Sequence, residues 1–110
     1  MLLFVTGPWM VAEDFNCPLH VDDRVGSPVL MNECIGFVDC LAFCGLYDLK
    51  SIGARYTWNN KQAGEARVYS KIDRCVVNED WALALPMSFI NYLPEGMMDH
   101  CPGVLHYTAT

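Results

Sequence analysis

The pattern of apolar and polar residues predicts most of the secondary structure. Short, mostly apolar segments that end at polar residues predict strands, and we expect strands over residues 9–12, 55–59, 72–77, 87–92 and 101–107. Residues 33–44 instead carry apolar side chains every three or four positions. That spacing predicts an amphipathic helix that ends before Gly45.

Polar, turn-forming residues separate these elements. Residues 14–28 are dense in Asp, Asn, Gly and Pro and predict a loop, and residues 61–65 predict a polar turn. Asn78 is the expected N-cap of a short helix that Pro86 ends. The order strand, helix, strand, strand, short helix, strand, strand predicts an α/β layered fold. We expect one domain over residues 1–110, with mixed or mostly antiparallel pairing.

The composition is that of a folded chain. With 110 residues, 53% hydrophobic and 18% charged, the sequence excludes a disordered chain and several domains. It has no apolar run long enough for a spanning helix, so we expect no membrane partner. The six cysteines include no Cys-x-x-Cys pair, and the first residues make a poor signal peptide. Reduced thiols inside the cell are therefore expected rather than disulfides.

The charges are arranged in blocks. Residues 1–48 carry a formal charge of −6, residues 49–74 carry +4, and residues 75–110 carry −4. A metal-dependent phosphodiesterase could use such an arrangement, because acidic groups hold the cation while Lys and Arg hold phosphates. A solvated basic loop explains the same pattern, so charge alone leaves both interpretations open.

Three polar clusters stand at ends of predicted strands. Asp14 and Asn16 follow the first strand, Asp73 opens a later one, and Asp99 and His100 precede the last. If the residue between Asp14 and Asn16 turns into the core, the two side chains point the same way. A carboxylate that accepts a proton or touches a metal would then face the same site as an amide that donates to a phosphoryl oxygen. An Asp next to a His adds a hard oxygen ligand and a titratable imidazole.

Each cluster alone has an ordinary structural explanation. Asp-x-Asn is a common turn sequence, and a single Asp-His pair is equally unspecific. Asp73 could be the ion-pair partner of Lys71 or Arg74. The chemistry therefore depends on whether the clusters converge at one sheet edge.

Taken together and in this order, the clusters resemble the endonuclease/exonuclease/phosphatase superfamily. The resemblance is carried by PWMVAEDFN at 8–16, YTW at 56–58, IDR at 72–74 and DH at 99–100. The chain is most similar to the endonuclease part of plant non-LTR retrotransposons of the long-interspersed type. Segments like FCGLYDL at 43–49, YTWNN at 56–60 and VNEDW at 77–81 recur there. The resemblance covers residues 8–107.

The resemblance implies a deoxyribonuclease-I-like four-layer α/β sandwich that cleaves a DNA strand with Mg²⁺, in the nucleus if the protein is functional. Asp14 matches the residue that helps activate the attacking water, and Asn16 matches the amide that contacts the scissile phosphate. Asp73 matches the carboxylate that orients the catalytic imidazole, which His100 matches. Asp99 matches a carboxylate at the metal side.

The resemblance also bears on the substrate. Tyr56 and Trp58 match a segment that lies against the DNA. Phosphatases that act on small phosphoesters share the same core. The Tyr-Thr-Trp segment and the retrotransposon-like stretches favour DNA.

The chain departs from the family pattern at three points. It resembles only the C-terminal half of the family domain, so the family's early Asn and metal-binding Glu have no counterpart. The family's Gly before Asp is Glu13, which adds bulk and charge beside the phosphate path. Its Ser before Asp-His is Met98, which removes a hydroxyl. We therefore expect weak or no nuclease activity from the chain alone, and self-association through an uncovered sheet.

Two further classes remain open. The basic stretch from Lys50 to Arg74 could bind nucleic acid without cleavage, with a strong salt dependence. Alternatively, the chain is a translated transposon fragment with no function.

Overall fold

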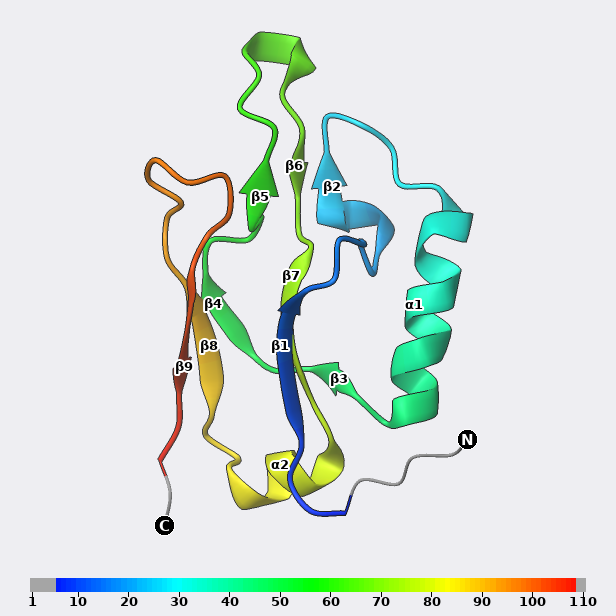
Figure 1. Cartoon of the computed structure of the whole chain (residues 1–110), viewed down its shortest axis with the longest axis vertical. Coiled ribbons are helices and arrows are strands. Elements are labelled where there is room, and N and C mark those ends of the chain that lie inside the picture. Colours follow the sequence, from blue (N-terminus) through cyan, green and yellow to red (C-terminus); the bar gives the residue numbers. More distant parts are fainter. Residues whose placement is uncertain (1–5, 109–110) are drawn as a thin grey trace.

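The elements are short and are tied together by pairing between distant parts of the chain (Figure 1). The computed structural model describes residues 6–108, so the outermost residues of the expected domain, 1–5 and 109–110, lie outside the described residues. The strands are β1 (Met10–Asp14), β2 (Arg24–Val25), β3 (Tyr47–Asp48), β4 (Ser51–Gly53), β5 (Trp58–Asn59), β6 (Tyr69–Ser70), β7 (Asp73–Val77), β8 (Phe89–Tyr92) and β9 (Gly103–His106). The helices are α1 (Met31–Cys44) and α2 (Glu79–Ala84), with 3-10 turns at Val21–Asp23 and Gly64–Ala66.

The described strands form three small sheets. Their orders are β1-β7-β3, β2-β6-β5 and β4-β8-β9. Every pairing among them is antiparallel except β4 with β8. The expected mixed α/β class and the mostly antiparallel pairing are thus confirmed.

The segment from β3 to β4 joins two of these sheets. β3 pairs with β7, and the backbone N–H of Leu49 continues that pairing to the carbonyl of Cys75 at 2.9 Å. The next carbonyl, that of Lys50, accepts from Ile90 at 3.0 Å, where β4 begins to pair with β8. Between the two sheets lies a small apolar cluster of Cys75, Ile90, Tyr92 and Cys101.

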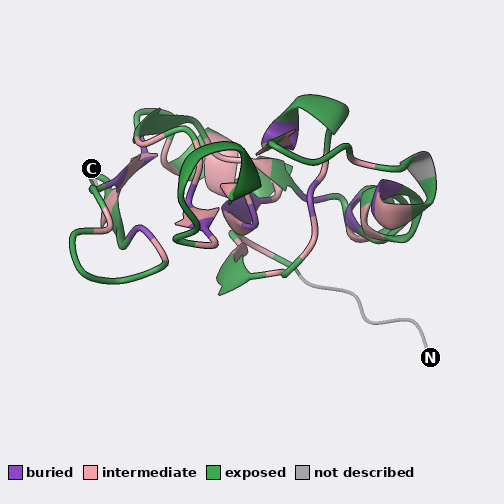
Figure 2. Ribbon diagram, turned by 90° about the horizontal axis from the view of Figure 1, so that it is seen from above, coloured by how far each residue is buried: buried purple, intermediate pink, exposed green. Residues whose placement is uncertain are grey.

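Helix α1 covers β1 and β7 from the side opposite that cluster. Leu41 of the helix packs with Val76 of β7 and with Leu46, and Phe15 packs against Phe37 with ring centroids 4.9 Å apart. The helix ends where the sequence predicts, because Gly45 takes the left-handed conformation that closes it. Buried segments alternate with exposed ones along the ribbon (Figure 2).

Several short strands were not expected. The segment 14–28 contains a 3-10 turn and β2, and the predicted strand 55–59 shrinks to β5. Residues 47–48, 51–53 and 69–70 also form strands. A strand of two or three residues has too few positions to show alternation, so only its pairing with a distant partner defines it.

Strands β1 and β9 are edges of their sheets. Next to β1, the carbonyl of Trp9 accepts from the backbone N–H of Asn78, and the backbone N–H of Phe15 donates to the carbonyl of Ile72. Every second residue from Trp9 to Phe15 therefore directs its backbone groups to β7. The intervening residue Ala12 directs its N–H and C=O to the open edge. Such an edge permits pairing with another chain, and self-association stays a prediction. No helix within residues 6–108 is long and apolar enough to cross a membrane.

Asn78 connects the start of β1 to the start of α2. Its Oδ1 accepts from the backbone N–H of Trp81 at 3.0 Å and of Trp9 at 2.9 Å, and its Nδ2 donates to the carbonyl of Gly7 at 3.0 Å. We expect Asn78→Ala to lower the free energy of unfolding by about 1–2 kcal/mol, because the helix loses its cap. Urea denaturation followed by circular dichroism measures this.

The matched control for Asn78→Ala lies on the same helix. Leu83 is 73% exposed, so Leu83→Ala should change stability by no more than about 0.5 kcal/mol. Equal stability of the Asn78 and Leu83 variants would contradict the capping role.

Candidate active site

Asp14 and Asn16 reach one pocket because the residue between them turns inward, as expected. Phe15 packs against Phe37 under α1. Asn16 follows with a left-handed backbone (φ 52°), and its N–H donates to Asp14 Oδ1 at 2.8 Å. This tight turn after β1 fixes the carboxylate and the amide at the same edge.

His100 lies between two carboxylates. Its Nδ1 is 2.8 Å from Asp73 Oδ2, and its Nε2 is 3.7 Å from Asp14 Oδ2. A backbone bridge to Trp58 places the imidazole beside the start of β7. Because a carboxylate only accepts, Nδ1 donates to Asp73 and the Nε2 edge faces Asp14.

The environment of His100 favours its charged form. Partial burial of the imidazole lowers its pKa, but the hydrogen bond and charge of Asp73 act in the opposite direction. The charges of Asp14 and Asp99 add to that effect, and the net result is a raised pKa. The protonated imidazole therefore persists to higher pH than that of an isolated histidine.

Thr57 supports the aspartate that holds His100. The side chain is fully buried, and its Oγ1 accepts the backbone N–H groups of Ile72 at 3.2 Å and of Asp73 at 3.1 Å. It thereby joins the loop before β5 to the first residue of β7. Thr57 stands inside the Tyr-Thr-Trp segment, but nothing in the sequence distinguishes this role.

We expect Thr57→Val to destabilise the protein by about 2–3 kcal/mol, because the near-isosteric change leaves the buried N–H of Ile72 and the part-buried N–H of Asp73 without an acceptor. Thr57→Ser keeps the hydroxyl and should remain within about 1 kcal/mol of the wild type. Thermal melts of the two variants compare them directly. If valine and serine were equally tolerated, Thr57 would not support Asp73 in this way.

The pocket beside His100 is open and has a volume of about 410 Å³. Its polar lining includes Arg24, which no sequence pattern distinguishes and whose guanidinium is 3.2 Å from Glu33. Ser70 was also missed, and its buried Oγ has no hydrogen-bond partner in the structure. The lining residues are Asp14, Asn16, Arg24, Ser27, Trp58, Asn60, Val68, Ser70, Ile72 and His100.

The structure brings most of the predicted site residues together. Asp14, Asn16, Trp58 and His100 line the pocket, and Asp73 contacts His100 from beside it. Asp73 is not an ion-pair partner of Lys71 or Arg74, which was the alternative interpretation.

Three predicted features lie elsewhere. Asp99 is exposed and acts on His100 only through its charge. Tyr56 packs against Tyr69, away from the pocket. Glu13 is not among the residues that line the pocket. Glu13 instead lines a neighbouring pocket together with Asp14 and Asp73, and the expectation that it adds charge beside the phosphate path stays a prediction.

The basic stretch 49–74 does not form one free face. Several of its cations are already engaged by acidic groups, and one of them is fully buried. The cations of this stretch therefore do not act together as one free group. The ion pairs are Arg74 with Asp23 and Asp48, Arg55 with Asp22, and Lys61 with Glu95.

The donor set determines which cation fits. Asp14, Asp73 and His100 each offer one ligand atom, and these atoms lie within 4.8 Å of one another. Asp73 is already engaged by His100, whereas Asp14 and Asp99 are exposed carboxylates. Mg²⁺ needs only one or two carboxylates and keeps waters or phosphate oxygens as its other ligands. Asp14 belongs to the cluster with Asp73 and His100, whereas Asp99 is not part of it.

Comparison of the chain with protein-family models, with curated proteins and with solved structures finds no match.

Proposed function

We propose that this pocket binds and slowly hydrolyses a DNA phosphodiester in the manner of the endonuclease/exonuclease/phosphatase superfamily. The observation that supports the proposal is the convergence of Asp14, Asn16 and His100 on one open pocket, with Asp73 behind the imidazole. These residues come from three distant segments of the chain. Their convergence is unlike what ordinary turns would produce.

The side chains suit the roles that the resemblance assigns. Asp73 fixes the tautomer and the orientation of His100, so that a protonated Nε2 faces the pocket and stabilises negative charge on a phosphoryl oxygen. Asn16 can donate its amide to the same group. Asp14 is exposed and can accept a proton from an attacking water.

Asp99, which the resemblance assigns to the metal side, is not part of the cluster that Asp14 forms with Asp73 and His100, so in this proposal Asp14 is the carboxylate that would hold Mg²⁺. The ion supplies electrostatic stabilisation of the charge that develops on the phosphate. Weak activity is expected, because the engaged carboxylate of Asp73 is not free to bind the metal and Met98 offers no hydroxyl to hold Asp99.

The architecture is consistent with half of a deoxyribonuclease-I-like sandwich. One apolar cluster lies between the β7 sheet and the β8–β9 pair, and α1 covers the outer face of β1 and β7. We propose this finer assignment of the fold together with the function.

Nicking of supercoiled plasmid in the presence of Mg²⁺ tests the proposed function. We expect slow nicking that EDTA abolishes and that His100→Ala reduces by about 10²–10⁴-fold. The control Asp39→Asn changes an exposed carboxylate on α1 and should leave the rate unchanged. Nicking that persists in His100→Ala, or a wild-type chain that cleaves nothing, would overturn the proposal. Cleavage of a small phosphomonoester in preference to plasmid would overturn DNA as the substrate.

A further inference from the structure

The segment 67–72 presents two different faces. Val68, Ser70 and Ile72 line the pocket described above. Arg67 and Tyr69 alternate with these residues, as does the partly buried Lys71, and therefore belong to the opposite face. The β5–β6 pair thus separates the pocket from a second surface that the proposed function does not use.

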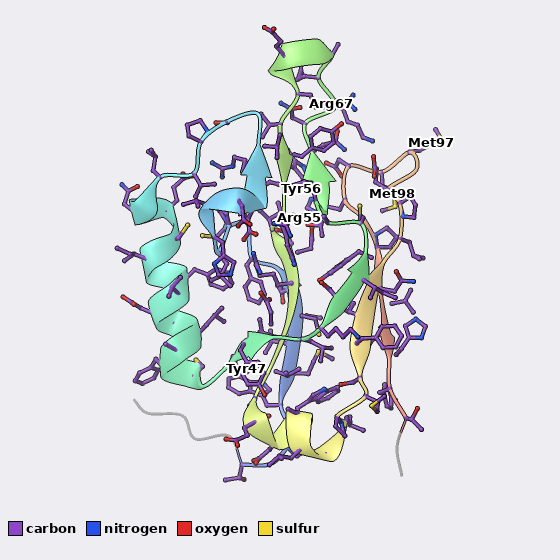
Figure 3. All side chains as sticks on the ribbon, turned by 180° about the vertical axis from the view of Figure 1, so that it is seen from behind. Tyr47, Arg55, Tyr56, Arg67, Met97 and Met98 are labelled. Atoms are coloured by element: carbon purple, nitrogen blue, oxygen red, sulfur yellow. The ribbon has the colours of Figure 1, made fainter. Side chains whose placement is uncertain are left out.

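Arginine and tyrosine side chains are interleaved on this second surface. The Arg67 guanidinium lies 5.9 Å from the ring centroid of Tyr69, and the Arg55 guanidinium lies 5.5 Å from that of Tyr56. The two tyrosine rings are themselves 6.2 Å apart. We call these four residues the Arg–Tyr strip. Figure 3 shows Arg67 near the tip of the hairpin, with Arg55 and Tyr56 further along the same hairpin.

The positive charge of the strip is only partly compensated. Arg55 pairs with Asp22 at 3.0 Å, but both side chains are largely exposed, so solvent screens the pair. Arg67 donates to the carbonyl of Gln62 and has no carboxylate within ion-pair distance in the described part of the chain. The strip can therefore attract an anionic polymer without first losing a buried ion pair.

We propose that the Arg–Tyr strip binds single-stranded nucleic acid on the face of the β5–β6 hairpin opposite the pocket. Unpaired bases stack on aromatic rings while arginines meet the backbone phosphates, and such contacts tolerate many sequences. A duplex keeps its bases stacked on one another and offers no free base to the tyrosines. An acidic peptide would use the arginines but leave the rings without flat partners.

Fluorescence anisotropy of a labelled 12-nucleotide oligo-dT in EDTA tests the strip without interference from cleavage. We expect Arg67→Gln to weaken binding about three- to tenfold and to reduce the slope of log affinity against log salt by about 0.7. Tyr69→Leu should weaken binding about tenfold through lost stacking. Lys50→Gln makes the same change of charge at an exposed site outside the strip, and it should bind like the wild type.

Each contrary result has a distinct meaning. Equal weakening by Lys50→Gln would indicate diffuse attraction and overturn the proposal. Weakening by His100→Ala would place the strand in the pocket and overturn the strip while leaving the proposed function intact. The proposed role of the Arg–Tyr strip would also be overturned if polyglutamate of equal charge displaced the oligonucleotide, or if the oligonucleotide did not bind at low salt. Because Arg67 is only partly buried, Arg67→Gln keeps the test valid if Tyr69→Leu fails to fold.

Discussion

Replacing Arg74 with alanine is expected to lower the free energy of unfolding by about 3–5 kcal/mol. The Arg74 side chain is 1% exposed and donates to Asp23, which is 4% exposed, and to Asp48 at 2.6 Å. Alanine would leave two carboxylates without their counter-charge, one of them deeply buried. A small domain is stable by only about 5–15 kcal/mol. The Arg74→Ala variant should therefore unfold at a clearly lower temperature and a lower urea concentration than the wild type.

The matched control is the same substitution at an exposed ion pair. Arg55 and Asp22 are 56% and 71% exposed, so Arg55→Ala should cost no more than about 1 kcal/mol. Urea denaturation followed by circular dichroism compares the two variants. If Arg74→Ala lay within 1 kcal/mol of Arg55→Ala, the Arg74 cluster would not hold the fold together.

The ion pairs of Arg74 with Asp23 and Asp48 show why some contacts could not be predicted from the sequence. From the sequence, its neighbour Asp73 could equally pair with Arg74 or Lys71, yet Asp73 contacts His100 while Arg74 contacts Asp23. Successive residues of a strand point to opposite faces, so the adjacent pair on β7 serves two sites. Asp23 comes from a segment that the sequence predicted only as a loop.

Local signals were sufficient where the determining residues lie close together. The apolar spacing of 33–44 and the cap at Asn78 involve neighbours a few residues apart, and both predictions are confirmed. The same holds for the turn that aims Asp14 and Asn16 into one pocket. Pattern and turn chemistry specify these features without help from the rest of the chain.

The remaining strands and the faces of their side chains depend on long-range pairing, which local sequence patterns do not predict. The sheet β2-β6-β5 is built from two-residue strands, and its existence depends on contacts between segments far apart in the sequence. That sheet places Ser70 in the pocket and Tyr69 in the Arg–Tyr strip. Both residues are therefore unremarkable in the sequence, because no local pattern reveals which face of an unpredicted strand they occupy.

The pH dependence of hydrolysis is expected to follow the charge of His100. If the protonated imidazole stabilises the reacting phosphate, activity is present at low pH and is lost as the pH rises through the pKa of His100. That pKa is raised from 6.5, with partial burial opposed by Asp73, Asp14 and Asp99. The falling limb of the pH–rate profile should therefore lie above 6.5 in the wild-type chain.

Asp73→Asn should move this limb to lower pH and reduce the rate of hydrolysis by about 10²–10⁴-fold. The substitution keeps the shape of the side chain but removes the negative charge that favours the imidazolium and fixes its orientation. Rates on a fluorogenic phosphodiester across pH measure the limb, and NMR titration of the His100 ring protons measures the pKa without relying on turnover. Asp39→Asn removes an equal charge from the exposed face of α1 and should leave the His100 titration unchanged. Were the titration of His100 the same in Asp73→Asn as in the wild type, the pair could not set the charge state on which the proposed chemistry depends.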